Sequence, residues 1–215
     1  MILKRIKIEI LDHMPTNCYI VVDDDSKEAI VIDPAGEVDT IVEMLDTLDA
    51  NLKYIYLTHC HADHTCGVSE LRNKKDAKVL IHRADFEGVN DDYFNLASYI
   101  GLNEIHIENV DRVDENDYIH VGNLIFRVIH TPGHTKGGSC LYCESEKLVF
   151  TGDTMFRGTW GRTDLPTSSM NQIMESITNK LLILPDDTIV YPGHGKSTMI
   201  VEERPIYEEL NPRAD

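Results

Sequence analysis

The sequence predicts a mixed α/β (α+β) fold, and three observations favour it. Short apolar runs of strand length recur along the 215 residues. Two stretches place apolar side chains at helical spacing, and the first of them lies between two strand-like runs. A cluster of histidines directly follows one run, as expected for a functional site at the end of a strand. Because no change of composition marks a linker, we treat residues 1–215 as a single domain.

The expected strands are short runs rich in β-branched residues. In the first, isoleucines alternate with charged residues over 6–10, which is typical of a half-exposed strand. The later runs, in chain order, are 19–22, 29–32, 54–57, 79–81, 124–129, 148–150 and 189–191.

Two helices are expected from apolar residues spaced three or four positions apart. The first stripe runs from Val38 to Leu48, and the second runs from Met170 to Leu181 with Ser168 or Ser169 as its N-cap. The acidic, Asn-rich segment from about 88 to 123 predicts loops and short helices instead, as an insertion over the site.

Composition and charge exclude several classes of function. A formal net charge of −17 argues against nucleic acid as a partner, because phosphate backbones are bound through clustered Lys and Arg. No apolar run is long enough to span a membrane, and no signal-peptide core follows Met1. Five unevenly spaced cysteines fit reduced thiols. We therefore expect a cytoplasmic protein without a membrane partner; the sequence carries no signal for an oligomeric state.

The most informative segment is Thr58-His59-Cys60-His61-Ala62-Asp63-His64, which follows an apolar run. In an extended chain the side chains of His59, His61 and Asp63 point to one side, and His64 points elsewhere. One short loop can then offer ligands to two neighbouring metal ions.

Three further turns follow expected strands, and each contains a metal-ligand residue beside glycine. They end in Thr131-Pro132-Gly133-His134, Thr151-Gly152-Asp153-Thr154 and Pro192-Gly193-His194-Gly195. Together with the histidine cluster they predict two ligand sets and a shared carboxylate. The first set is His59, His61 and His134, the second is Asp63, His64 and His194, and Asp153 bridges both.

This ordered set of motifs resembles the metallo-β-lactamase superfamily. Within it, the segment from Thr151 to Asp164 and the ending around His194 are similar to single-domain glyoxalase II-type (hydroxyacylglutathione hydrolase-like) enzymes. The resemblance implies a four-layer αββα sandwich with the metals at one edge, between the sheets. Full-length members carry a helical C-terminal domain that grips glutathione, and we expect no such domain after His194.

The expected activity is hydrolysis of a small-molecule thioester on two divalent ions. Zn²⁺ is the expected ion, and iron or manganese also suits His and carboxylate ligands. A water that bridges two such ions can have its pKa lowered from 15.7 towards about 7, which makes hydroxide available at neutral pH. A thiolate leaving group, from an acid of pKa about 8.5, needs no strong general acid. Asp63 and Asp153 are assigned catalytic roles among the ligands.

Three alternatives remain open at this stage. Persulfide dioxygenases resemble the chain through the histidine motif and would use one iron bound by His59, His134 and Asp153. A lactonase or β-lactamase is a weaker candidate, because many β-lactamases have Cys at a ligand position where Asp153 stands here. A purely structural metal site is disfavoured, since such sites are usually closed tetrahedra rich in Cys.

The remaining polar residues near the motifs receive simpler interpretations. Lys136, Arg157 and Arg162 are the nearest cations and could hold a substrate carboxylate, although Arg162 is equally suited to an internal ion pair, with Asp164 as a helix cap. The cysteines at 60, 66, 140 and 143 are expected to be packed thiols, with the last two on opposite faces of a strand. The histidines at 82 and 130 are expected to be structural hydrogen-bonding groups.

Overall fold

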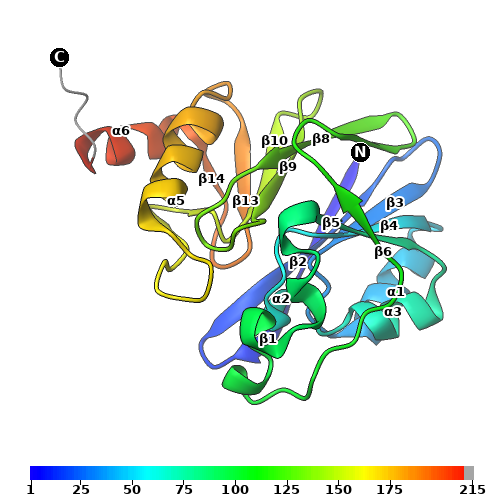
Figure 1. Cartoon of the computed structure of the whole chain (residues 1–215). Coiled ribbons are helices and arrows are strands. Elements are labelled where there is room, and N and C mark those ends of the chain that lie inside the picture. The colour runs from blue at the N-terminus through cyan, green and yellow to red at the C-terminus, as the bar shows by residue number, and fades with distance from the viewer. Residues whose placement is uncertain (211–215) are drawn as a thin grey trace.

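Two six-stranded β-sheets face each other in the computed structural model, which describes residues 1–210 (Figure 1). The first sheet has the order β1 (Ile2–Leu11), β2 (Met14–Val22), β3 (Glu28–Ile32), β4 (Asn51–Leu57), β5 (Lys78–His82), β6 (Val110–Val113). The second has the order β14 (Thr198–Met199), β13 (Ile189–Pro192), β10 (Leu148–Gly152), β9 (Ser139–Cys143), β8 (Leu124–His130), β7 (Tyr118–Val121). A small hairpin joins β11 (Met155–Phe156) to β12 (Thr159–Trp160).

Helices cover the outer face of each sheet (Figure 1). On the first sheet they are α1 (Val38–Thr47) and α3 (Val68–Lys74), and on the second they are α5 (Met170–Ser176), the π-helix η4 (Ile177–Leu181) and α6 (Ile200–Leu210). The short helices are α2 (Ala62–Thr65), η1 (Arg83–Asp85), η2 (Gly88–Asn90), α4 (Asp92–Asn95) and η3 (Ser98–Ile100). No helix within residues 1–210 combines the length and the apolar character that crossing a bilayer requires.

Three separate apolar clusters correspond to the three interfaces of a four-layer sandwich. One packs α1 and α3 on the first sheet, a second fills the space between the sheets, and a third packs α5, η4 and α6 on the second sheet. Strand β2 shows the alternation that builds these layers, because Ile20 and Val22 belong to the outer cluster whereas Tyr19 and Val21 belong to the inner one. The expected αββα architecture is confirmed.

The segment from 88 to 123 differs from the prediction in its second half. Its first half does form short helices, and Leu96, Tyr99 and Ile100 from it line the cleft described below. Residues 110–113 and 118–121, however, are the edge strands β6 and β7 of the two sheets. Edge strands this short and half-exposed carry too few apolar residues to stand out in a sequence.

The second helical stripe is interrupted although its apolar face is buried as expected. It begins at α5, where the Ser169 hydroxyl accepts a hydrogen bond from the Gln172 amide, and continues as a π-helix from Ile177. Ser169 is therefore the cap, and Asp164 is not.

The alternation along β8 gives a direct test of the layer between the sheets. Phe126 is fully buried in the inner cluster, whereas its neighbour Ile125 is 48% exposed on the other face. We expect Phe126→Ala to lower the free energy of unfolding by about 3–5 kcal/mol because it leaves a cavity between the sheets. Ile125→Ala is the matched control and should change it by less than about 0.5 kcal/mol in urea denaturation. Equal losses from the two variants would contradict the assigned layer.

Candidate metal centre

The candidate ligands come from loops that follow strands of both sheets, at the edge where the sheets meet. The loop after β4 carries His59 and His61, and the loops after β8, β10 and β13 carry the remaining ligands of the second sheet. The sheets are tied together here, since Tyr19 Oη donates to the Pro192 carbonyl at 2.7 Å and Thr16 pairs with His194 in an isolated β-bridge. Side chains far apart in sequence therefore converge at this edge.

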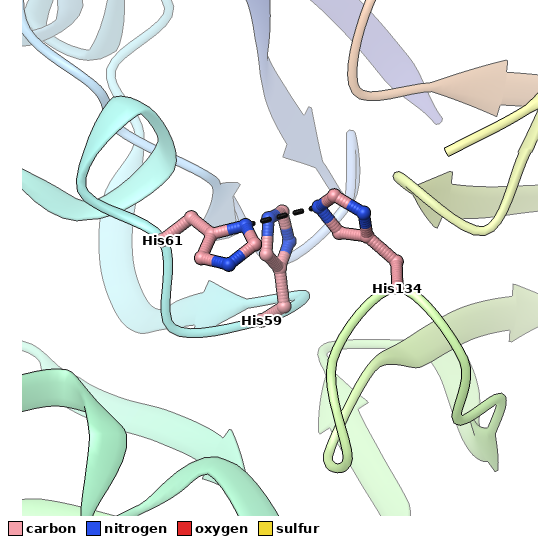
Figure 2. A group of neighbouring side chains, drawn as sticks. All are labelled: His59, His61 and His134. Carbon is pink, nitrogen blue, oxygen red and sulfur yellow. Dashed lines mark hydrogen bonds between the residues drawn. The ribbon is translucent and has the colours of Figure 1, made fainter. Parts of the chain in front are cut away.

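The first ligand set is a group of three buried imidazoles from two loops (Figure 2). His59 and His61 come from the loop after β4, and His134 faces them from the loop after β8. His61 Nδ1 lies 2.9 Å from His134 Nε2. One nitrogen from each of the three rings lies within 4.8 Å of the others, which suits three ligands of one ion.

The second ligand set lies beside the first and contains a carboxylate. Nε2 of His64 lies 3.2 Å from Nε2 of His194 and 3.8 Å from Asp63 Oδ2. The same carboxylate oxygen is 3.5 Å from His194 Nε2. Asp63, His64 and His194 thus form a second group able to hold an ion.

Asp153 lies between the two sets and reaches both with its two oxygens. Its Oδ1 is 3.4 Å from His64 Nε2, and its Oδ2 is 3.5 Å from both His134 Nε2 and His194 Nε2. A carboxylate in this position can be shared by two neighbouring ions. The structure therefore brings all seven candidate residues together. The groups able to hold an ion are His59, His61 and His134, then Asp63, His64 and His194, and also His59, His64 and Asp153.

The local conformation of the histidine motif differs from the extended chain that the sequence suggested. The chain is extended up to His61 and then turns into the one-turn helix α2, which carries Asp63 and His64. Because of that turn, Asp63 faces His64 and His194 instead of continuing on the side of His59 and His61. The prediction that alternate side chains along 59–63 point to one side was wrong. The segment nevertheless supplies residues to both ligand groups.

Hydrogen bonds on the far side of the rings fix which nitrogen faces the centre. His134 Nδ1 donates to the Arg162 carbonyl at 2.9 Å, and His194 Nδ1 donates to the Pro15 carbonyl at 3.1 Å. A carbonyl only accepts, so in each neutral ring Nε2 bears a lone pair. His64 Nδ1 lies 3.0 Å from the Asp33 carboxylate, which fixes that ring in the same way.

Metal ions satisfy this arrangement more completely than protons do. Nε2 of His64 and Nε2 of His194 lie 3.2 Å apart, so without a metal one of the two must bear a proton. Buried His59 Nε2 and Asp153 Oδ1 have no hydrogen-bond partner. Tetrahedral ligands about 2.0–2.1 Å from a zinc ion lie about 3.3 Å from one another, close to the spacings observed here. A metal ion would bind these unpaired acceptors at this spacing.

The charges around the second set favour positive charge at the centre. Burial disfavours a charged His64, but Asp153, Asp63 and Asp33 outweigh it and raise the pKa of this imidazole to about 10. Burial also raises the pKa of Asp63, yet His64 and His194 outweigh it and hold the pKa below its usual value. In the first set, burial and the neighbouring imidazoles lower the pKa of His61 to about 3, which keeps it neutral as a ligand must be.

Two buried carboxylates that the sequence analysis missed hold the ligand loops in place. Asp33 follows β3 and accepts from the Thr58 amide at 2.8 Å, from the Thr58 hydroxyl at 2.7 Å and from His64. Asp85 follows β5 and accepts from the amides of Cys60 and Gly137 and from the Thr135 hydroxyl, so it joins the loops of the first set. Asp33 could have been found, because it ends an apolar strand just before a proline; nothing comparable marked Asp85.

Glycine at position 193 is required by the crowding of the centre. A Cβ there would lie 2.4 Å from Asp153 Oδ1 and 2.7 Å from His64 Cε1. The Gly-His turn thus admits His194 without displacing two other candidate ligands.

A cleft of about 380 Å³ opens onto the centre, and its lining includes five of the seven candidate ligands. Of the three cations expected near a substrate, Arg162 lines this cleft, and it also forms an ion pair with Asp164 at 2.7 Å. Lys136 lies 5.1 Å from the centre of the Phe94 ring, and Arg157 lies 3.9 Å from Glu202; neither lines the cleft.

The cysteines and the other two histidines have structural surroundings. Cys60 is buried and Cys66 is half-buried, with its thiol directed at the Ala35 carbonyl. Cys140 and Cys143 belong to different apolar clusters, as their positions on opposite strand faces predicted. The rings of the histidines at 82 and 130 stack on each other 3.9 Å apart.

Comparison with known proteins identifies the family. A family model described as the metallo-β-lactamase superfamily matches residues 11–194. The chain belongs to this superfamily. It is 38% identical to a protein of Aquifex aeolicus over 93% of each chain. It is also 33% identical to hydroxyacylglutathione hydrolase GloC of Haemophilus influenzae, over 92% of this chain and 94% of that one.

Solved structures of the superfamily superpose on nearly the whole chain. BLEG-1, described as a B3 metallo-β-lactamase, has a TM-score of 0.87 at 32% identity and covers 98% of this chain and 100% of its own. TTHA1623 in a di-iron-bound form has a TM-score of 0.80 at 31% identity, covering 94% and 96%. ETHE1 from Myxococcus xanthus has a TM-score of 0.78 at 29% identity, covering 100% and 92%.

The role given to Asp33 can be tested by metal binding. We expect Asp33→Asn to weaken metal affinity by about 10–100-fold, because the variant loses the carboxylate that orients His64 and Thr58. Asp46→Asn changes an exposed carboxylate on α1 and is the control, with unchanged affinity. Competition with a chromophoric chelator measures the metal affinity of both variants. Equal affinities would contradict the role given to Asp33.

Proposed function

We propose that the protein is a hydrolase that cleaves thioesters of small thiol carriers with two divalent cations. The observation that supports it best is the position of Asp153, whose two oxygens lie 3.4–3.5 Å from ligand nitrogens of both sets. A carboxylate shared in this way is typical of two-metal hydrolytic centres. The relative named hydroxyacylglutathione hydrolase GloC, at 33% identity, supports the thioester as the substrate.

The chain's own residues would divide the work between the two ligand sets. His59, His61 and His134 would hold one ion, Asp63, His64 and His194 the other, and Asp153 both. Bound there, the ions would supply an ionised water and polarise the substrate carbonyl. Asp63 and Asp153 both line the cleft that opens onto the ligands, and as ligands of the ions they would have catalytic roles.

No separate general acid is required for a thioester. The leaving thiolate comes from an acid of pKa about 8.5, so it departs without prior protonation. Among the described residues, the titratable side chains that line the cleft are Tyr99 and Arg162, apart from the candidate ligands. A site without a strong acid suits a good leaving group better than an amine or alkoxide.

A mononuclear iron dioxygenase is the second candidate, and the similarity to ETHE1 from Myxococcus xanthus is the observation that favours it. It would need only His59, His134 and Asp153. The complete second set, with Asp63 Oδ2 3.5 Å from His194 Nε2, is more than one iron requires and favours the two-metal hydrolase. Similarity to BLEG-1 adds β-lactams and lactones to the substrates worth testing.

Substitution of the shared carboxylate tests the proposal. We expect Asp153→Asn to lower kcat/KM for a small thioester by at least about 10²-fold, because it removes a negative ligand from both ions. The fold should persist by circular dichroism, and the exposed Asp46→Asn should retain full activity.

The metal-loaded wild-type protein separates the two candidates. Thiol release from a thioester without oxygen uptake is expected of the hydrolase. Oxygen consumption with a persulfide, sulfite formation and no thioester cleavage would reject it in favour of the dioxygenase.

A further inference from the structure

The cleft above the candidate metal centre has apolar walls contributed by separate segments. They come from the β1–β2 hairpin, the segment from the end of α4 through η3, and the β11–β12 hairpin. The residues are Leu11, Met14, Leu96, Ile100, Phe156 and Trp160. Apart from the ligands at its floor, the cleft is therefore built for an apolar group.

Apart from the two proposed ions, positive charge is scarce along this cleft. Arg162 is the one Lys or Arg among the described residues that line it. Its guanidinium donates from Nε at 2.7 Å and from a terminal nitrogen at 2.8 Å to the two oxygens of Asp164. This fork geometry is the one with which Arg would bind a substrate carboxylate, so Asp164 already occupies it.

The outer end of the cleft carries more negative than positive charge. An adjoining hollow shares Leu96, Tyr99, Arg162 and Leu165 with the cleft and adds two carboxylates, Asp92 and Asp164. A carrier extending outwards from the centre would thus meet two carboxylates and one guanidinium. The whole chain, whose side chains carry a formal net charge of −17 before any ion binds, repels anions further at low salt.

Resting on the function proposed above, we propose that the substrates are uncharged thioesters with an apolar acyl or thiol part, and that carriers bearing carboxylates or phosphates are poor substrates. The acyl group or the carrier packs on the apolar walls, while the thioester carbonyl lies over the ligands. The cleft of about 380 Å³ has room for such an apolar part. Hydrolysis adds water across the C–S bond and yields a carboxylate, a thiol and a proton.

A pair of substrates that differ in charge and by one methyl group tests this specificity. S-Butanoyl-N-acetylcysteine carries one carboxylate, and its methyl ester carries none. With the metal-loaded protein at low salt we expect kcat/KM to be at least 10-fold higher for the methyl ester. The value for the acid should rise with added salt as repulsion is screened, and the value for the ester should not. Equal or faster cleavage of the acid would overturn the proposal.

Chain length tests the apolar walls independently. We expect kcat/KM to rise about 3- to 4-fold per added methylene from acetyl to butanoyl, as each becomes buried. Ile100→Ala should flatten this rise. Ile183→Ala, at a position 71% exposed and outside the cleft, is the control and should leave it unchanged.

Releasing Arg162 from Asp164 should change the preference of the protein for the methyl ester over the acid. Asp164→Asn removes the counter-charge, so the ratio of kcat/KM for the acid to that for the ester should rise at least 3-fold. Asp186→Asn breaks an ion pair with Arg204 away from the cleft and should leave the ratio as it was. An unchanged ratio in Asp164→Asn would contradict the role given to this pair.

Binding of uncleavable analogues separates failure of this inference from failure of the proposed function. The S-butyl thioethers of N-acetylcysteine and of its methyl ester should bind with at least 10-fold different affinities by calorimetry, the ester more tightly. If this difference is found without any thioester cleavage, the proposed reaction fails and the specificity of the cleft stands. If thioesters are cleaved and the acid binds as tightly as the ester, the specificity alone fails.

Discussion

The structure depends on one electrostatic constraint: lone pairs and carboxylates gathered in a buried volume need positive charge. Carbonyl acceptors behind His134 and His194 turn their lone pairs inwards, and Asp63 and Asp153 add negative charge between them. Without metal ions, protons on the imidazoles must balance the carboxylates, and the buried polar atoms that stay unpaired are costly. The fold maintains the arrangement because the ligands lie on loops anchored to two packed sheets.

The loops are held by interactions that are not themselves ligands. Asp33 and Asp85 each accept several hydrogen bonds from the backbone and hydroxyl groups of the ligand loops, and glycine at 193 leaves the space that Asp153 occupies. A centre pre-organised in this way loses little entropy when ions bind. The same rigidity keeps the shape and charge of the cleft walls fixed around the centre.

The sequence predicted the elements that carry strong local signals. Buried strands such as 29–32 and the amphipathic stripe from Val38 are readable because their apolar spacing is set by the layers they pack between. The seven candidate ligands were readable because each stands in a glycine- or histidine-rich turn after a strand. The short edge strands β6 and β7, the helical turn at Asp63, and Asp85 were not, since they depend on contacts between residues far apart in the chain. The placement of Lys136 and Arg157 outside the cleft likewise follows from three-dimensional packing.

The most direct test is the metal content and position in protein purified without chelators. Elemental analysis combined with anomalous diffraction should find two divalent ions per chain, about 3.5–4 Å apart, on either side of Asp153. One should be bound by His59, His61 and His134, and the other by Asp63, His64 and His194. A fully active protein with a single ion, or with ions bound elsewhere, would contradict the two-metal centre.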